Sequence, residues 1–349
     1  MRWKPLAATI VAAALLAGCG SATKEGPKPG EAAAGQPAQK VTLTLSTPDP
    51  DSSSITEAAK HFAELVAEKS KGAVEIKVFP NGTLYNGDPN AAVKQLGAGS
   101  LDMLTLSTSL YANFDSRFTA ISIPYLFDST DQLLKYLNGE PGQELLAGLD
   151  RLQIKGLALW TRSFRQMTNS KRPITGPQDL KGLKFRVPNN PLWVEFFKAA
   201  GAAPTPMAFG EVYNALQLKT IDGQENPIDI ARSAKFYEVQ KYLTISNHMA
   251  DGWVVGININ KFASLPQDVQ KILMEAAAET QSWKLRYDQE QDAQALEFLK
   301  SKGMEVNTLT PEQQQAFVDL AKPLYPKFAE LVRDQAFFEK TLKFVGKAN

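Results

Sequence analysis

Two hydrophobic periodicities alternate along this chain, and their order restricts the fold more than any other feature of the sequence. Apolar residues at every second position, as in Val41, Leu43 and Leu45, are typical of a strand with one buried face. The next stretch places its apolar residues on one face of a helix, and Ser54 and Glu57 have the spacing of a capping box at its start. Because the same order then repeats, the sequence predicts an α/β fold with a parallel sheet.

The alternation continues through most of the chain. A second strand over 74–78, a helix that starts at Asp88-Pro89 and a buried strand over 101–106 complete a βαβαβ unit. Further strands are expected at 156–160, 183–187, 203–207 and 253–259, and short helices at 193–200 and 211–218. From about 266 to 302 the chain has few helix breakers, which predicts one very long or jointed helix. Such a helix could lie across two lobes and couple their motion.

The N-terminus has the features of an export signal. Its sequence, MRWKPLAATIVAAALLAGC, has a basic start, an apolar run too short to span a membrane, and small residues before Cys19. The Leu-Ala-Gly-Cys ending resembles a bacterial lipobox, which implies that residues 1–18 are removed and that Cys19 is lipidated. A chance cysteine in an ordinary cleaved signal is the alternative. Residues 19–39 are rich in Gly, Pro and Ala, so we expect a disordered tether.

The charge balance bears on the class of partner. The chain has 38 basic and 37 acidic residues, and removal of Arg2 and Lys4 with the signal leaves 36 basic residues. A nearly neutral protein lacks the concentrated basic surface typical of nucleic-acid-binding proteins, so we expect no nucleic-acid partner. About 310 residues follow the tether, which is enough for two domains. Cys19 is the only cysteine, so no internal disulfide is possible.

The sequence gives no positive sign of an enzyme. His61 and His248 are the only histidines, and the surrounding patterns favour structural or surface roles for both. No group of His, Cys and Asp residues has metal-ligand spacing, and there is no glycine-rich phosphate loop, so we expect no catalytic residue, metal or cofactor. A glycosidase-type pair of carboxylates stays open, because carboxylates far apart in the chain can meet in space.

Two arginines stand at the ends of neighbouring predicted strands. Arg165 follows the strand that ends at Trp160, and Arg186 lies near the end of the strand over 183–187, just before a Pro-Asn-Asn-Pro loop. Ligands of α/β folds bind beyond the carboxyl ends of strands, and arginine can hold a carboxylate with two parallel hydrogen bonds. The two arginines could therefore share one carboxylate. Alternatively, one or both pair with structural Asp or Glu residues.

A long run of segments carries a resemblance to a known family. In chain order the segments include FAELVAEKSKGAVEIKVFPNGTL, LGAGSLDM, IPYLF, TNSKRPITGPQDLKGLKFRVPNN, GAAPTPMAFGEVYNALQLKTIDGQENP and AKFYEVQKYLTISNH. Together they resemble the substrate-binding proteins of tripartite ATP-independent periplasmic (TRAP) transporters. The resemblance extends from Val41 to about Gln313, and this length makes it more specific than any short motif. It implies two α/β lobes in a periplasmic-binding-protein-like fold, joined at a hinge and spanned by the long helix.

The resemblance also assigns candidate residues to the binding of a substrate. It implies that Arg186 is the chief carboxylate ligand, assisted by Arg165, and that Asn189, Phe209 and Asn226 line the pocket. Asparagine side chains can bond hydroxyl or carboxyl groups, and phenylalanine offers an apolar wall. Loop capping and core packing are the alternatives for these three residues.

The first of the two lobes, which contains the N-terminal strands, departs from the pattern of the sialic-acid-binding members. Ser107 stands where those proteins have an acidic residue, and Pro48 and Asp49 replace an asparagine-containing loop after the first strand. We count Ser107 and Asp49 among the candidate substrate-binding residues. Trp160 and Trp253 lie near strand ends and could stack on a sugar ring, although core packing is the commoner role of tryptophan.

The resemblance implies a function and a division into lobes. The expected function is capture of an organic acid and its delivery to a membrane permease, by a protein that is lipid-anchored and faces the periplasm or the cell exterior. C4-dicarboxylates, sugar acids and 2-keto or 2-hydroxy acids are the expected ligand classes. Lobe I is predicted at 40–160 plus 251–290, and lobe II at 161–250 plus 291–349. The alternatives are a sensory binding protein that reports to a receptor and a secreted hydrolase.

Overall fold

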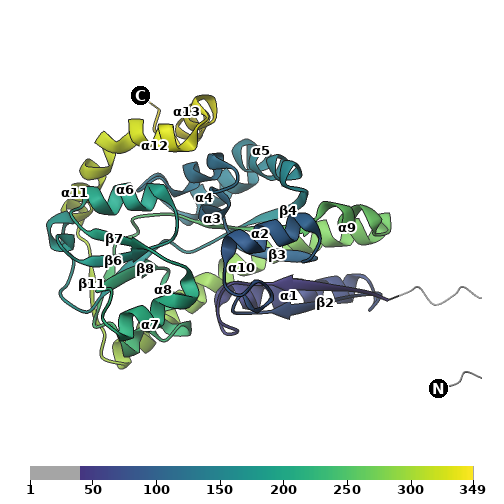
Figure 1. The fold of residues 1–349 in the computed structure, drawn as a ribbon, viewed down its shortest axis with the longest axis horizontal. Helices are drawn as coiled ribbons and strands as arrows, with labels where there is room; N and C mark the ends of the chain where they lie inside the picture. The colour runs from purple at the N-terminus through teal and green to yellow at the C-terminus, as the bar shows by residue number, and fades with distance from the viewer. Residues whose placement is uncertain (1–39, 349) are drawn as a thin grey trace, which may run out of the picture. The chain divides into compact units, whose positions relative to one another are not determined.

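The computed structural model describes residues 40–348 and contains two β-sheets, each covered by helices (Figure 1). The first sheet has the strand order β2-β1-β3-β10-β4. Its strands are β1 (Val41–Ser46), β2 (Val74–Phe79), β3 (Met103–Ser107), β4 (Ile154–Thr161) and β10 (Gly252–Asn258). Strand β1 pairs in parallel with β2 and β3, which confirms the predicted βαβαβ unit. Strand β10 is antiparallel between β3 and β4, so a late segment of the chain completes an early sheet.

The helices of this sheet begin at polar caps. Asp88 accepts a hydrogen bond from Asn90 N at 2.9 Å and precedes Pro89, as predicted, at the start of α2 (Pro89–Ala98). Helix α1 (Ser54–Lys69) starts one residue earlier than the predicted capping box allows. Its cap is Ser53, which has an extended backbone and accepts from Thr56 N, so the Ser54–Glu57 box was wrong.

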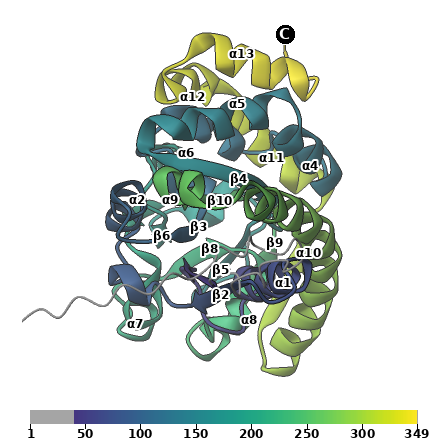
Figure 2. The same cartoon turned by 90° about the vertical axis from the view of Figure 1, so that its right-hand side faces the viewer.

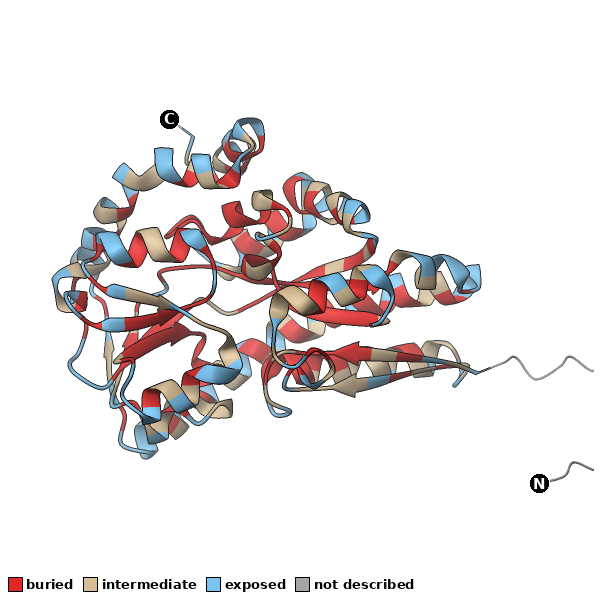
Figure 3. Cartoon of the chain, viewed as in Figure 1, coloured by how far each residue is buried: buried red, intermediate tan, exposed pale blue. Residues whose placement is uncertain are grey.

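The second sheet has the strand order β11-β9-β5-β8-β6-β7. Its strands are β5 (Gln166–Asn169), β6 (Lys184–Val187), β7 (Ala203–Pro206), β8 (Gly223–Asn226), β9 (Tyr242–Ile245) and β11 (Glu305–Thr308). Strand β6 pairs in parallel with β7 and β8, whereas β5 is antiparallel to β8 and β9. The helices between these strands are α6 (Pro191–Ala199), α7 (Val212–Gln217) and α8 (Ile228–Ser233). Figure 3 shows that the central strands of both sheets are buried.

The predicted long helix is one continuous element, α10 (Gln267–Ser301), of 35 residues. Its first half contributes Leu273, Ala276 and Ala277 to the core of the first sheet, and its second half contributes Ala295 and Leu299 to a core beside the second sheet. Figure 2 shows α10 beside both α1 and α8, which it contacts. The helix therefore belongs to both lobes, as expected.

The C-terminal helices contact elements that cover both sheets. Helix α12 (Tyr325–Val332) packs on the 3₁₀ segment Ser116–Ser122 and on α6, and α13 (Gln335–Phe344) packs on α5 (Glu140–Gly148) beside the first sheet. Helix α11 (Pro311–Ala321) precedes them. The predicted lobe boundaries stay a prediction.

The predicted signal, Cys19 and the tether lie outside the described residues. Within 40–348, no helix is long and apolar enough to cross a membrane.

Candidate functional site

Strand ends from the two sheets meet at a small cavity of about 40 Å³. Its walls come from the loop after β1, the end of β3, the β4–β5 connection, β6, the end of β8 and the start of β10. The lining residues are Pro48, Asp49, Ser107, Ser109, Leu110, Arg162, Arg165, Arg186, Pro188, Phe209, Asn226 and Trp253. Six of the seven candidate substrate-binding residues are in this set, although they are scattered over almost 180 positions of the chain. The missing one is Asn189.

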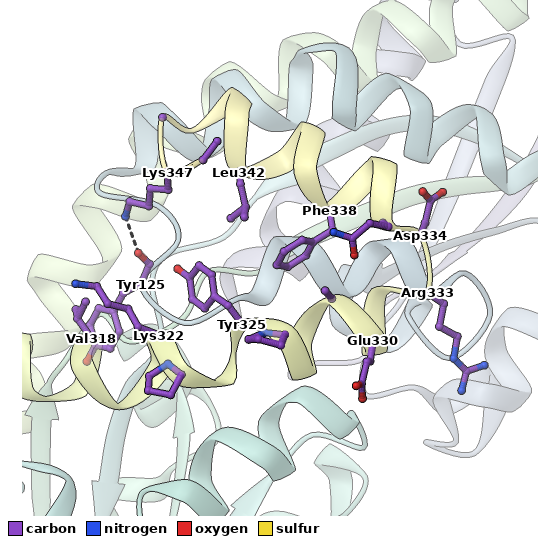
Figure 4. A pocket seen from close by; sticks show the side chains of 16 residues that line it. Tyr125, Val318, Lys322, Tyr325, Glu330, Arg333, Asp334, Phe338, Leu342 and Lys347 are labelled. Carbon is purple, nitrogen blue, oxygen red and sulfur yellow. Dashed lines mark hydrogen bonds between the residues drawn. The ribbon is translucent and has the colours of Figure 1, made fainter.

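Other cavities are larger but chemically different. One of about 1250 Å³ lies among the C-terminal helices and the Tyr125 loop (Figure 4). Its charged groups, such as Lys322, Glu330 and Arg333, are dispersed around its rim, and Lys347 bonds the Tyr125 carbonyl at 2.7 Å. Volume alone would favour that cavity. We place the candidate site at the smaller one because three guanidinium groups and buried carboxylates converge there.

Arg165 is held in a buried ion-pair network. Its Nε and Nη2 donate to the carboxylate of Glu225, with Nη2 2.7 Å from Oε1, and Nη2 also donates to Asn226 Oδ1 at 3.0 Å. Nη1 lies 3.4 Å from Asp251 Oδ2. Burial alone would raise the pKa of Glu225, but Arg165 and the bonded His248 outweigh it and lower this pKa to about 2. Arg165 therefore has a full set of partners within the protein.

Arg162 occupies the same cavity, although sequence reasoning did not select it. Its Nη1 lies 3.2 Å from Asp251 Oδ2, and its Nη2 donates to Asn226 Oδ1 at 3.1 Å. The guanidinium carbon lies 4.3 Å from the centroid of the Trp253 ring, within the range of a cation–π contact. The available signal was its place directly after β4, three residues before Arg165.

Arg186 differs from both neighbours because it forms no ion pair with any described carboxylate. Its Nε and Nη2 both donate to the carbonyl oxygen of Met207, at 3.2 and 2.8 Å. The side chain is buried, and burial, with a further contribution from Arg165 and Arg162, lowers its pKa to about 9. A buried guanidinium without a carboxylate is costly for the fold. The position is thus a strong site for an anion.

Asp49 is the least satisfied acidic group of the cavity. It is buried, and its Oδ2 accepts no hydrogen bond from any described residue. The nearest cation is Arg162, whose Nη2 lies 4.0 Å from that oxygen. Burial, only partly offset by Arg162, raises the pKa of Asp49 to about 6. By contrast, Asp251 accepts from Ser107 at 2.6 Å and Thr108 at 2.7 Å as well as from Arg162.

The remaining candidates divide into lining and non-lining residues. Phe209 supplies an apolar wall and packs edge-on against Phe236. Asn189 is exposed and only its carbonyl is engaged, by Asn113 Nδ2 at 3.3 Å. Its neighbour Asn190 is the buried one, and it caps α6 and donates to Ser109 O at 2.7 Å. The structure therefore does not bring Asn189 to the cavity.

The tryptophans and histidines take separate places. Trp160 lies in the core and donates to Ala277 O at 2.8 Å, whereas Trp253 lines the cavity. His248 is buried against Glu225, and His61 stacks on Trp283. Among the residues that the structure describes, no group of His, Cys, Asp and Glu could hold a metal ion.

Comparisons with known proteins agree with this architecture. The family model described as bacterial extracellular solute-binding protein, family 7 (DctP), matches residues 45–331. The 2,3-diketo-L-gulonate-binding periplasmic protein YiaO of Escherichia coli is 36% identical over 81% of this chain and 84% of its own length. The C4-dicarboxylate-binding periplasmic protein DctP of Rhodobacter capsulatus is 35% identical over 81% of this chain and 84% of its own length.

Solved structures show the same similarity. A sugar acid binding protein from Advenella mimigardefordensis, in complex with galactonate, superposes with a TM-score of 0.84 at 31% identity and covers 90% of this chain and 100% of its own. A TRAP periplasmic solute-binding protein from Shewanella oneidensis with bound succinate gives a TM-score of 0.82 at 31% identity, with 88% of this chain and 99% of that chain covered.

Proposed function

Because this chain belongs to family 7 of the bacterial extracellular solute-binding proteins, the TRAP type, we propose that it captures an organic acid through a contact between Arg186 and a carboxylate. The observation that carries this proposal is the state of Arg186, which is buried at the cavity and has no carboxylate partner within residues 40–348. Relatives whose ligands are named bind organic acids of several kinds. Family membership thus supports the class of ligand, and Arg186 supports the point of attachment.

Within the described residues, the hydrogen bonds of Arg186 leave one edge of its guanidinium free for a ligand. A guanidinium carries five N–H groups, and Met207 O takes one from Nε and one from Nη2. The end formed by Nη1 and the second hydrogen of Nη2 is the edge that binds a carboxylate with two parallel hydrogen bonds. Arg162 and Arg165 are already engaged by Asp251 and Glu225.

The other lining residues then have supporting roles. We propose that Asp49 and Ser107 contact the polar part of the ligand, that Phe209 covers an apolar part, and that Asn226 contacts the ligand while Arg162 and Arg165 fix its amide. Arg165 adds positive potential to the site, although Glu225 holds it in place. Asn189 is left out of this contact set because its side chain is exposed outside the cavity.

Binding requires a change in the separation of the two lobes. A cavity of about 40 Å³ is far smaller than the roughly 300 Å³ or more of a typical small-molecule site. We propose that lobe I (40–160 plus 251–290) and lobe II (161–250 plus 291–349) separate to admit the acid and then close over it. Closure excludes water and so strengthens the arginine–carboxylate contact.

A thermal-shift screen tests the proposal. The exported chain from residue 20 onward is melted with aldonates, uronates, keto acids, dicarboxylates and neutral sugars. A ligand at about 100 times its dissociation constant adds roughly 2.7 kcal/mol to the free energy of unfolding. We expect at least one acid to raise the melting temperature and no neutral sugar to do so. Stabilisation by neutral sugars alone would contradict the proposal.

The family also gives the partner, and the N-terminus suggests an anchor. We propose that the closed protein delivers its ligand to the membrane subunits of a TRAP transporter, and that a lipid on Cys19 holds the protein at the membrane through the tether. Cys19→Ser should move the protein from the membrane fraction to the soluble fraction after cell lysis. Retention of this variant in the membrane fraction would argue against lipidation.

A further inference from the structure

The backbone of the loop after β1 fixes the position of the Asp49 carboxylate. The Asp49 carbonyl accepts from Asn81 N at 2.9 Å, and Thr47 N donates to Phe79 O at 2.9 Å, so the loop is bonded to the end of β2. The side chain takes no part in these bonds. Asp49 therefore lines the cavity on a backbone that these hydrogen bonds to Phe79 and Asn81 hold in place.

The acceptor capacity of Asp49 is unmet within the described residues. Its Oδ2 is buried and receives no hydrogen bond, and the 4.0 Å to Arg162 Nη2 is too long for one. Arg162 cannot turn to Asp49 without leaving Asp251 or Asn226, to which it donates at 3.2 and 3.1 Å. A buried acceptor in this state favours a ligand that supplies a donor.

Of the three guanidinium groups that line the cavity, only one has no ion pair with a described carboxylate. Glu225 and Asp251 engage Arg165 and Arg162, and only Arg186 has no carboxylate among the described residues. The Arg186 guanidinium can therefore bind one ligand carboxylate through two charged hydrogen bonds. A second ligand carboxylate would meet only guanidinium groups whose charge is already paired with Asp251 or Glu225, and it would share a small buried cavity with Asp49.

We propose that Asp49 makes this site selective for hydroxylated monocarboxylates, of the aldonate type, over dicarboxylates. This inference rests on the proposed function, in which Arg186 holds the ligand carboxylate. A ligand hydroxyl can donate a hydrogen bond to the Asp49 carboxylate, which satisfies the hydroxyl and the carboxylate. A second ligand carboxylate has no hydrogen to donate and is repelled by the negative charge of Asp49. The solved structures with galactonate and with succinate are both 31% identical to this chain, so sequence identity does not decide between the two ligand classes, and our choice comes from Asp49.

Two ligand pairs of equal carbon number test the inference. Titration calorimetry at pH 7.5, where both carboxyl groups of a dicarboxylic acid are ionised, compares D-erythronate with succinate and D-gluconate with adipate. We expect the hydroxy acid of at least one pair to bind 100-fold or more tightly than its dicarboxylate, because a site built around a hydroxyl acceptor strongly rejects a ligand that lacks the donor. Equal affinities, or a preference for the dicarboxylates, would overturn the inference without any variant.

Two matched variants then assign the selectivity to its source. Asp49→Asn keeps an acceptor and removes the charge, so it should narrow the preference for the hydroxy acid at least tenfold. Asp51→Asn changes an exposed residue of the same loop and should leave the preference unchanged. An unaltered preference in Asp49→Asn refutes the role of Asp49.

A third variant separates this inference from the function on which it rests. If Arg186→Met abolishes binding of every acid while Asp49→Asn leaves the preference for the hydroxy acid intact, the carboxylate-binding role of Arg186 is supported and only the role of Asp49 is refuted. If Arg186→Met binds the acids as the unmodified protein does, the proposed function fails as well.

Discussion

Replacing Arg186 with methionine should abolish ligand binding and, at the same time, stabilise the ligand-free protein. The loss of binding follows from the two hydrogen bonds that the free guanidinium edge can give to a carboxylate. Hydrogen bonds to charged groups contribute roughly 1.5–3 kcal/mol each, so the pair accounts for about 3–6 kcal/mol. The expected loss of affinity is therefore about 10²- to 10⁴-fold.

The gain in stability follows from the cost of burying an uncompensated charge. Burial, aided by Arg165 and Arg162, lowers the pKa of Arg186 well below that of a free guanidinium, to about 9. At about 1.4 kcal/mol per pH unit, that gap is a cost of roughly 5 kcal/mol at neutral pH. The variant also leaves the Met207 carbonyl without its donors, which takes back about 1–3 kcal/mol. The free energy of unfolding should thus rise by roughly 2–4 kcal/mol.

Urea unfolding and calorimetric titration measure the two effects on the same samples. Methionine keeps an unbranched apolar stem in the space of the arginine, so packing losses are small. Lys184→Met is the matched control, because Lys184 is an exposed residue of the same strand, and it should alter neither quantity. If Arg186→Met destabilised the ligand-free protein by more than 1 kcal/mol or kept near-normal affinity, the reasoning about the buried charge would be wrong.

Two further predictions concern the buried carboxylates. Glu225→Gln leaves Arg165 buried without its main counter-ion, so the free energy of unfolding should fall by about 3–5 kcal/mol in urea titrations, and a loss below 1 kcal/mol would contradict the buried pair. The folded-state pKa of Asp49, about 6, lies above the ordinary 3.8, so the folded state binds this proton more tightly and Asp49 contributes stability as the pH falls. Between pH 7.5 and 5, unfolding curves should show that the unmodified protein gains about 1–2 kcal/mol relative to Asp49→Asn, and parallel pH profiles would refute this.

Local sequence patterns were sufficient to predict most of the strands and helices. Strands β1 and β2, the Asp88-Pro89 helix start and the length of α10 depend on residues that are neighbours in sequence, so periodicity and capping preferences predict them. The cap of α1 was misplaced by one residue because Ser53 and Ser54 have similar capping propensities, and only the backbone conformation distinguishes them.

The site required information that local patterns do not hold. The partners of Arg165 lie 60 and 86 residues away, at Glu225 and Asp251, so the sequence alone could not decide between a ligand contact and an internal ion pair. The same distance in sequence hid Arg162, whose partners come from two other strands' ends. The resemblance to a known family pointed to Arg186, but only the three-dimensional structure shows that no described carboxylate pairs with it.

The shared helix α10 has a consequence for how the protein unfolds. Its halves complete the apolar cores of the two lobes, so neither lobe can lose its structure without removing packing partners from the other. We therefore expect the two lobes to unfold in a single cooperative transition, in spite of the hinge between them. A ligand bound at the cavity should therefore raise the resistance of both lobes to heat and proteolysis together.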